Sequence, residues 1–114
     1  MHELSATQGI INSLLELALV RKIHTIHYVG LEVGILTTYE EIPFRYYYDL
    51  LKKDHSLLEH SVLEITMVPG TLRCDECQKE SLISKEIELV CKECGSSQTT
   101  IITGQDVLIK NIKV

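Results

Sequence analysis

The chain has 114 residues, of which 16 are acidic and 11 are basic, so its formal net charge is −5. This length suits one ordinary domain, or one small domain with a smaller satellite, and leaves no room for a multidomain enzyme. An apolar content of 45% argues against disorder, and the acidic charge balance disfavours nucleic-acid and membrane partners.

The first half of the chain is predicted to form a helix, a strand and a second helix. Apolar residues recur at helical spacing from about His2 to Lys22, which predicts an amphipathic helix. The apolar period then changes to two, which predicts a half-buried strand that ends at Gly34. Pro43 fits the first position of a second helix that runs to about Lys53.

The second half is predicted to contain two further strands, which flank a cysteine-rich segment. Apolar and polar residues alternate from Leu63 to Met67, and Pro69-Gly70 marks a break after this strand. The last strand is expected at residues 107–114. Its apolar alternation loses phase, which predicts a bulge or a phase slip near Asn111.

The chain is expected to be cytoplasmic. It begins Met1-His2-Glu3 with no basic region ahead of an apolar segment, so it shows no secretory signal. Its most apolar stretch is interrupted by Glu16 and is shorter than the roughly 20 apolar residues that a membrane span needs. Thiols in such a compartment stay reduced, so cysteines there point first to metal binding or redox chemistry.

Two pairs of cysteines, Cys74/Cys77 and Cys91/Cys94, each have two residues between the thiols. This spacing lets both sulfurs of a pair face one ion from a tight turn, and two such turns complete a tetrahedral shell of four sulfurs. The pattern therefore predicts a closed, structural zinc site. Two disulfides conflict with the reducing compartment, and a redox pair needs a parallel α/β pattern that is not predicted here.

The order of the elements predicts the α+β fold class, with two helices on a three-stranded, mainly antiparallel sheet and an inserted zinc-ribbon domain. The α+β domain is expected at residues 1–68 plus 101–114, and the zinc-ribbon domain at residues 69–100. The ribbon has few large apolar residues, so metal binding would supply its folding free energy. Residues 70–100 carry six acidic and four basic side chains, which favours a protein partner over nucleic acid.

Met1-His2-Glu3 is a second candidate metal site. A free α-amine, a deprotonated amide nitrogen and the imidazole of His2 can form fused chelate rings around one ion. Nitrogen-rich, square-planar coordination suits Ni(II) or Cu(II) and not Zn(II). The positive end of a helix opposes a bound cation, although ionised amides and the Glu3 carboxylate could offset this. From spacing alone, a start methionine followed by a solvated histidine is the favoured interpretation.

Four segments together carry a family resemblance. They are Met1-His2-Glu3 at the start of a helix, Leu31-Glu32-Val33-Gly34 at the end of the first strand, the paired cysteines, and Gly104-Gln105-Asp106-Val107 at the start of the last strand. In this order they resemble the HypA/HybF family, the hydrogenase nickel-incorporation metallochaperones. The resemblance covers essentially the whole chain and implies a nickel metallochaperone that is not an enzyme and has no catalytic residues.

The resemblance also implies the roles of the site residues. Nickel, the transported ion, would bind at Met1, His2 and Glu3, with His2 as the key ligand and Glu3 contributing its backbone nitrogen more than its carboxylate. Structural zinc would bind the four cysteines: Cys74, Cys77, Cys91 and Cys94. The implied partners are a nickel-associated GTPase, the large-subunit precursor of NiFe hydrogenase and, in some members, urease accessory proteins. The oligomeric state is left open between a monomer and a homodimer.

Four other histidines are interpreted as surface, edge or loop residues, and the sequence leaves open whether any of them assists nickel binding: His24, His27, His55 and His60. Two other functions stand as alternatives. A zinc-ribbon adaptor in transcription or translation would have an inert N-terminus. A small enzyme would use His2 and a carboxylate such as Glu3, but the sequence shows neither a nucleophile–base set nor an open zinc site.

Overall fold

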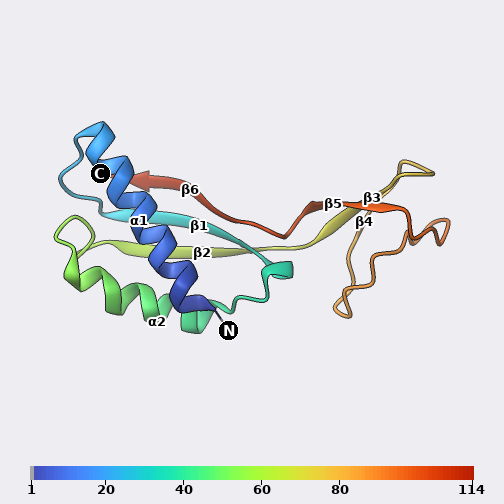
Figure 1. The fold of residues 1–114 in the computed structure, drawn as a ribbon, viewed down its shortest axis with the longest axis horizontal. Helices are drawn as coiled ribbons and strands as arrows, with labels where there is room; N and C mark the ends of the chain where they lie inside the picture. Colours follow the sequence, from blue (N-terminus) through green and yellow to red (C-terminus); the bar gives the residue numbers. More distant parts are fainter. Residues whose placement is uncertain (1) are drawn as a thin grey trace. The chain divides into compact units, whose positions relative to one another are not determined.

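The computed structural model describes residues 2–114, which contain two α-helices and six β-strands (Figure 1). In chain order the elements are α1 (Glu3–Arg21), β1 (Tyr28–Gly34), η1 (Ile35–Thr37), α2 (Glu41–Leu51), η2 (Lys52–Asp54), β2 (Val62–Val68), β3 (Thr71–Cys74), β4 (Glu80–Leu82), β5 (Thr99–Thr103) and β6 (Val107–Lys113), where η marks a 3₁₀ turn. No helix in the described part of the chain is long and apolar enough to span a membrane.

These residues form two compact units. Within the described chain, the first unit comprises residues 2–32, 39–66 and 108–114, and the second comprises residues 33–38 and 67–107. Most of the second unit, residues 67–107, therefore falls between the β2 and β6 segments of the first, and residues 33–38 join it from the end of β1 and η1. The sequence predicts one domain at residues 1–68 plus 101–114 and another at residues 69–100. This division stays a prediction, because the two compact units are defined only by how the chain packs.

The sheet of the first unit has the strand order β2-β1-β6. β1 and β2 run in the same direction and β6 runs against them (Figure 1), so this sheet is mixed. The connection from β1 to β2 contains α2, and a crossover of this length is what a parallel pair requires. The α+β fold class is confirmed, and the β1–β2 pair is the part of the sheet that is not antiparallel.

The core of the first unit lies between its sheet and its two helices. In β2, Leu63 and Ile65 are buried while the residues between them are exposed, so one face of the sheet is covered. α1 and α2 also pack against each other. The buried apolar side chains that the two helices and β1 contribute to this core are Ile10, Ile11, Leu14, Ala18, Phe44, Tyr48, Val29 and Leu31.

Tyr48 is the largest of the fully buried side chains among the described residues. Its hydroxyl lies 2.7 Å from Ser61 Oγ, which itself donates to the Leu58 carbonyl at 2.6 Å. Burial raises the pKa of Tyr48, so the phenol stays protonated and can donate this hydrogen bond.

We expect Tyr48→Phe to lower the free energy of unfolding by about 1 kcal/mol, because the change removes one buried hydrogen bond and little volume. Urea unfolding followed by circular dichroism measures the difference. Tyr46→Phe is the matched control, since Tyr46 is 62% exposed and its stability effect should be negligible. Equal stability of Tyr48→Phe and the unaltered chain would contradict this role of the hydroxyl.

The element boundaries differ from the sequence predictions by a few residues. Pro43 is the third residue of α2, not the first, because α2 begins at Glu41. Proline is tolerated there because an amide in the first helical turn has no intrahelical partner. In β6, Ile109 and Ile112 are both half-buried while Asn111 is exposed, which confirms the predicted phase slip.

The second unit contains an antiparallel sheet of strand order β4-β3-β5, with Leu72 opposite Ser81 and Ile101. Leu72 is 1% exposed. The other buried apolar side chains described in this unit are Val33, Cys74 and Cys91. An apolar core this small contributes little hydrophobic free energy, so the unit needs a further source of stability.

Three glycine backbones meet in the second unit. A Cβ built on Gly34 would lie 2.1 Å from the Gly104 carbonyl oxygen, and one built on Gly104 would lie 2.6 Å from the Gly70 Cα. Gly104 also has a φ of 99°, which residues with side chains rarely adopt. The Leu36 N–H donates to the Gly104 carbonyl at 2.8 Å, which holds this crossing in place. The chain segments can come this close only because the three residues carry no side chain.

Candidate metal centre

Two backbone turns of the same design carry the four cysteines. The carbonyls of Cys74 and Cys91 accept the N–H of Gln78 and Gly95, respectively, both at 2.9 Å. Each of these two cysteines also donates its own N–H to the carbonyl five residues further on, again at 2.9 Å. Gln78 and Gly95 have φ values of 66° and 76°, which reverse the chain behind each cysteine pair.

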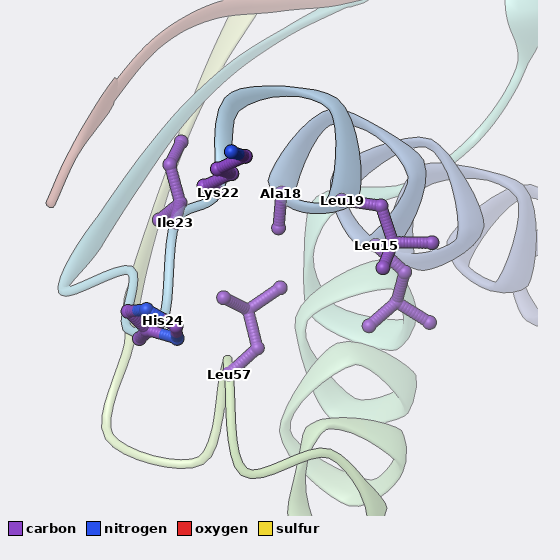
Figure 2. Close-up of a pocket in the computed structure, with 7 residues that line it drawn as sticks. All are labelled: Leu15, Ala18, Leu19, Lys22, Ile23, His24 and Leu57. Atoms are coloured by element: carbon purple, nitrogen blue, oxygen red, sulfur yellow. The ribbon is translucent and has the colours of Figure 1, made fainter.

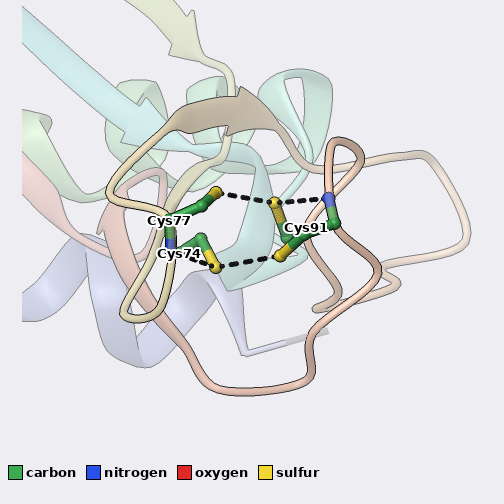
Figure 3. Close-up of side chains that lie close together, drawn as sticks. Cys74, Cys77 and Cys91 are labelled. Atoms are coloured by element: carbon green, nitrogen blue, oxygen red, sulfur yellow. Dashed lines mark hydrogen bonds between the residues drawn. The ribbon is translucent and has the colours of Figure 1, made fainter.

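The turns bring all four sulfur atoms within 4.8 Å of one another (Figure 3). Cys74 Sγ lies 3.5 Å from Cys94 Sγ, and Cys77 Sγ lies 3.6 Å from Cys91 Sγ. A tetrahedral zinc ion with Zn–S bonds of about 2.3 Å separates its ligands by about 3.8 Å, so the cluster fits such an ion. The cysteines are free thiols, because a disulfide needs an S–S distance of about 2.05 Å.

The surroundings of the cluster shift the pKa values of two of its thiols in opposite directions. The pKa of Cys91 is lowered to about 6, chiefly by the amide of Cys94 and further by that of Glu93. The backbone of Ser96 acts to lower the pKa of Cys94, but the neighbouring sulfurs of Cys74 and Cys91 outweigh it and raise this pKa to about 12. Thiolates this close repel one another, and a divalent cation relieves the repulsion by replacing the protons.

The other predicted site begins at His2, the residue directly before α1. The His2 side chain is exposed, and the His2 carbonyl accepts the Ala6 N–H at 3.1 Å in the first turn of the helix. The predicted ligand Met1 lies outside the described residues. An exposed imidazole at this position is accessible both to a metal ion and to the ligands of another protein.

Glu3 is 4% exposed although it opens α1. Its Oε2 accepts the backbone N–H of Glu40 at 3.1 Å, and its carbonyl accepts the Thr7 hydroxyl at 2.5 Å. Glu40 is the residue before α2, so the carboxylate ties the start of α1 to the start of α2. This contact was missed from the sequence, because residues 37 positions apart give no local signal of it.

The remaining histidines lie elsewhere on the first unit. His24, His27 and His60 are exposed, and His55 is half-buried. Within residues 2–114, the four cysteines are the one group of three or more His, Cys, Asp or Glu side chains placed to hold a metal ion. These four histidines therefore take part in no preformed multidentate group of side chains in the described chain.

An apolar hollow of about 550 Å³ lies beside the C-terminal end of α1 (Figure 2). It is lined by Leu15, Ala18, Leu19, Lys22, Ile23, His24 and Leu57. His24 is the one candidate metal ligand in this lining, and a single imidazole does not chelate an ion. The hollow is therefore not a further metal site.

The comparisons with known proteins agree on one family. The family model described as hydrogenase/urease nickel incorporation, metallochaperone, hypA matches residues 1–114. The hydrogenase maturation factor HypA of Acidithiobacillus ferrooxidans is 32% identical over 114 residues, which cover 100% of this chain and 99% of the relative. The factor of the same name from Nostoc sp. is 36% identical, with 100% and 96% of the two chains covered.

A solved structure supports the same fold. The solution structure of the Ni metallochaperone HypA from Helicobacter pylori superimposes with a TM-score of 0.75 and covers 97% of this chain and 95% of its own, at 19% sequence identity. These matches confirm the resemblance to the HypA/HybF family that the N-terminal and cysteine motifs indicated. The chain belongs to the HypA family of hydrogenase/urease nickel-incorporation metallochaperones, which is not an enzyme family.

Proposed function

We propose that this chain binds Ni(II) through its first residues and delivers it, together with a partner GTPase, to the large-subunit precursor of NiFe hydrogenase. Urease, reached through its accessory proteins, is a second proposed recipient. The observation that carries the proposal is the HypA family match over residues 1–114. The proposed compartment is the cytoplasm, where thiols stay reduced and remain available to bind a metal.

The proposed nickel ligands are Met1, His2 and Glu3. The exposed imidazole of His2 supports this assignment, because nitrogen ligands suit square-planar Ni(II). The Glu3 carboxylate already accepts the Glu40 N–H, so Glu3 is proposed to contribute its backbone nitrogen. The α-amine of Met1 would complete the nitrogen set. Ligands at a chain end leave one side of the ion open, so a partner can exchange them for its own.

The four cysteines are proposed to hold structural zinc. Their sulfur spacing fits a tetrahedral ion, and the small apolar core of the second unit leaves stability to be supplied by metal binding. Four thiolates around zinc leave no open position for a substrate. The sequence has no glycine-rich phosphate loop, so GTP hydrolysis in this scheme belongs to the partner protein.

We expect His2→Ala to weaken nickel binding at least tenfold, because one chelate ring is lost. Isothermal titration of untagged protein with Ni(II) measures the affinity. A second variant with two residues added before Met1 keeps His2 but converts the α-amine into an amide, and it should lose affinity as well. His24→Ala is the matched control, since His24 is also exposed, and it should bind like the unaltered chain.

The same titration separates the proposal from the zinc-ribbon adaptor. The adaptor function requires no N-terminal metal, so it predicts equal nickel binding by all four proteins. That outcome would exclude the proposed nickel site. Loss of binding in His24→Ala alone would instead move the site to the other end of α1.

A further inference from the structure

The four cysteine sulfurs contact one another in a crossed pattern (Figure 3). Cys74 Sγ lies 3.5 Å from Cys94 Sγ, across 20 positions of the sequence. Cys77 Sγ lies 3.6 Å from Cys91 Sγ, across 14 positions. Each contact therefore joins the first cysteine of one turn to the second cysteine of the other turn, and neither contact lies within a turn.

Backbone amides hold the first sulfur of each turn in place. Cys74 Sγ accepts the N–H of Cys77 at 3.4 Å. Cys91 Sγ accepts the N–H groups of Glu93 and Cys94 at 3.4 and 3.5 Å. Each first sulfur is thereby fixed beside the second sulfur of the opposite turn. A disulfide needs an S–S distance of about 2.05 Å, so each crossed contact has to shorten by only about 1.5 Å.

An oxidant in the solvent reaches the four thiols unequally. Cys94 is exposed and Cys77 is half-buried. Cys74 and Cys91 are both buried. Each crossed contact therefore joins a more accessible sulfur to a buried one. Accessible thiolates are oxidised first, and a second thiol beside them resolves the product to a disulfide.

We propose that the four cysteines are an oxidation site for hydrogen peroxide, at which two crossed disulfides, Cys74–Cys94 and Cys77–Cys91, replace the zinc ion. The Cys94 thiolate attacks the peroxide, whose O–O bond breaks, so that a sulfenic acid forms and hydroxide leaves. The Cys74 thiolate then attacks the Cys94 sulfur, the S–S bond forms, and a second hydroxide leaves. The other pair consumes a second peroxide in the same way. Four thiolates lose four electrons, two peroxides gain them, and zinc departs as Zn(II).

The crossed pairing keeps the second unit folded after zinc has left. A disulfide inside one turn would leave the two turns unlinked. The crossed disulfides link the turns at two places, as zinc does, and they close loops long enough to restrict the unfolded chain. A thiol reductant reverses the change, so the disulfide form lasts only while peroxide outpaces reduction. This inference rests on the proposed structural zinc and is independent of the proposed nickel site.

Peptide mapping of the oxidised chain tests the pairing. The zinc-loaded chain is treated with hydrogen peroxide, its remaining thiols are blocked, and it is cut after glutamate. Glu76 and Glu93 each lie between the two cysteines of one pair, so the four cysteines fall in four different peptides. We expect peptides joined through the crossed pairs to be at least about tenfold more abundant than peptides joined within a turn.

The chain unfolded in urea with a chelator, and then oxidised in the same way, is the matched control. Its thiols should pair mainly within each cysteine pair, because the shortest loops close most readily. A chromogenic chelator measures the released zinc, and we expect one zinc ion for every two disulfides. The zinc content of the reduced chain is measured first. A reduced chain without zinc would refute the proposed structural zinc, while the peptide map still decides the pairing.

Amide hydrogen exchange tests whether the crossed disulfides replace zinc as the link between the turns. Residues 67–107 should exchange slowly in the oxidised, zinc-free chain and at least about a hundredfold faster in the reduced, chelator-treated chain. Disulfides mainly within the turns, the same crossed pairing in the unfolded chain, zinc retained after full oxidation, or fast exchange in the oxidised chain would each overturn the proposal.

Discussion

Cys74→Ser should unfold the second unit and leave the first unit folded. Cys74 is 0% exposed, and it belongs to a unit whose other buried apolar side chains are few. Structural zinc contributes about 10–16 kcal/mol to the folding of small zinc domains, far more than such a core supplies. Serine is a poor zinc ligand, so the variant loses most of this free energy.

Two measurements check this result. The zinc content, measured by mass spectrometry, should fall close to zero. Amide hydrogen exchange should become fast across residues 67–107 and stay slow in α1 and β1, because the first unit has its own core. Addition of a strong chelator to the unaltered protein should reproduce the same exchange pattern.

Ser81→Ala is the matched control for the cysteine variant. Ser81 also lies in the second unit, and its buried hydroxyl has no hydrogen-bond partner among the described residues. Removal of this hydroxyl should therefore leave the zinc content and the slow amide exchange of the second unit unchanged. Retained protection of residues 67–107 in Cys74→Ser would show that zinc is not what folds this unit.

Gly104→Ala should destabilise the second unit by about 3 kcal/mol or more. The new Cβ would lie 2.6 Å from the Gly70 Cα and 3.1 Å from the Pro69 carbonyl oxygen, both of which are backbone atoms that cannot rotate away. The φ of 99° adds strain for any residue with a side chain. Unfolding must be followed with probes in the second unit, since a protein of two units need not unfold in one step.

Two other glycines separate the effects of space and backbone conformation. Gly95 has a φ of 76°, but no atom lies within 4 Å of the point that its Cβ would occupy, so Gly95→Ala should cost only the strain, about 1–2 kcal/mol. Gly9 has open space and a helical conformation, so Gly9→Ala should stabilise α1 by about 0.5–1 kcal/mol. Equal effects of the Gly104 and Gly95 substitutions would refute the role of close backbone approach.

The features predicted well from the sequence were those with local or regularly spaced signals. The strand at β1 followed from a period of two, and the sulfur cluster followed from two pairs of cysteines with the same internal spacing. α1 was predicted within one residue at each end, since its apolar residues recur at helical spacing. Each of these patterns depends on near neighbours in the chain.

The features that were missed depend on contacts between distant residues. The direction of β1 relative to β2 is set by how α2 returns the chain, which periodicity does not reveal. Glu3 was expected to bind nickel through its backbone nitrogen more than its carboxylate, and the contact of that carboxylate with the Glu40 amide was not foreseen. Gln78 gave no turn signal of its own. Gln78 lies four residues after Cys74, as Gly95 lies four residues after Cys91. This equivalence could have predicted the turn at Gln78.

The insertion of most of the second unit between β2 and β6 determines the order in which the protein is completed during synthesis. The ribosome makes all four cysteines before it makes β6, so the edge of β1 that β6 covers stays unpaired while the thiols emerge. An unpaired strand edge exposes backbone hydrogen-bonding groups, which can pair with strands of other chains and cause aggregation. Early zinc uptake by the nascent ribbon would bring the flanking segments together, and would thereby shorten the time for which that edge is open to aggregation.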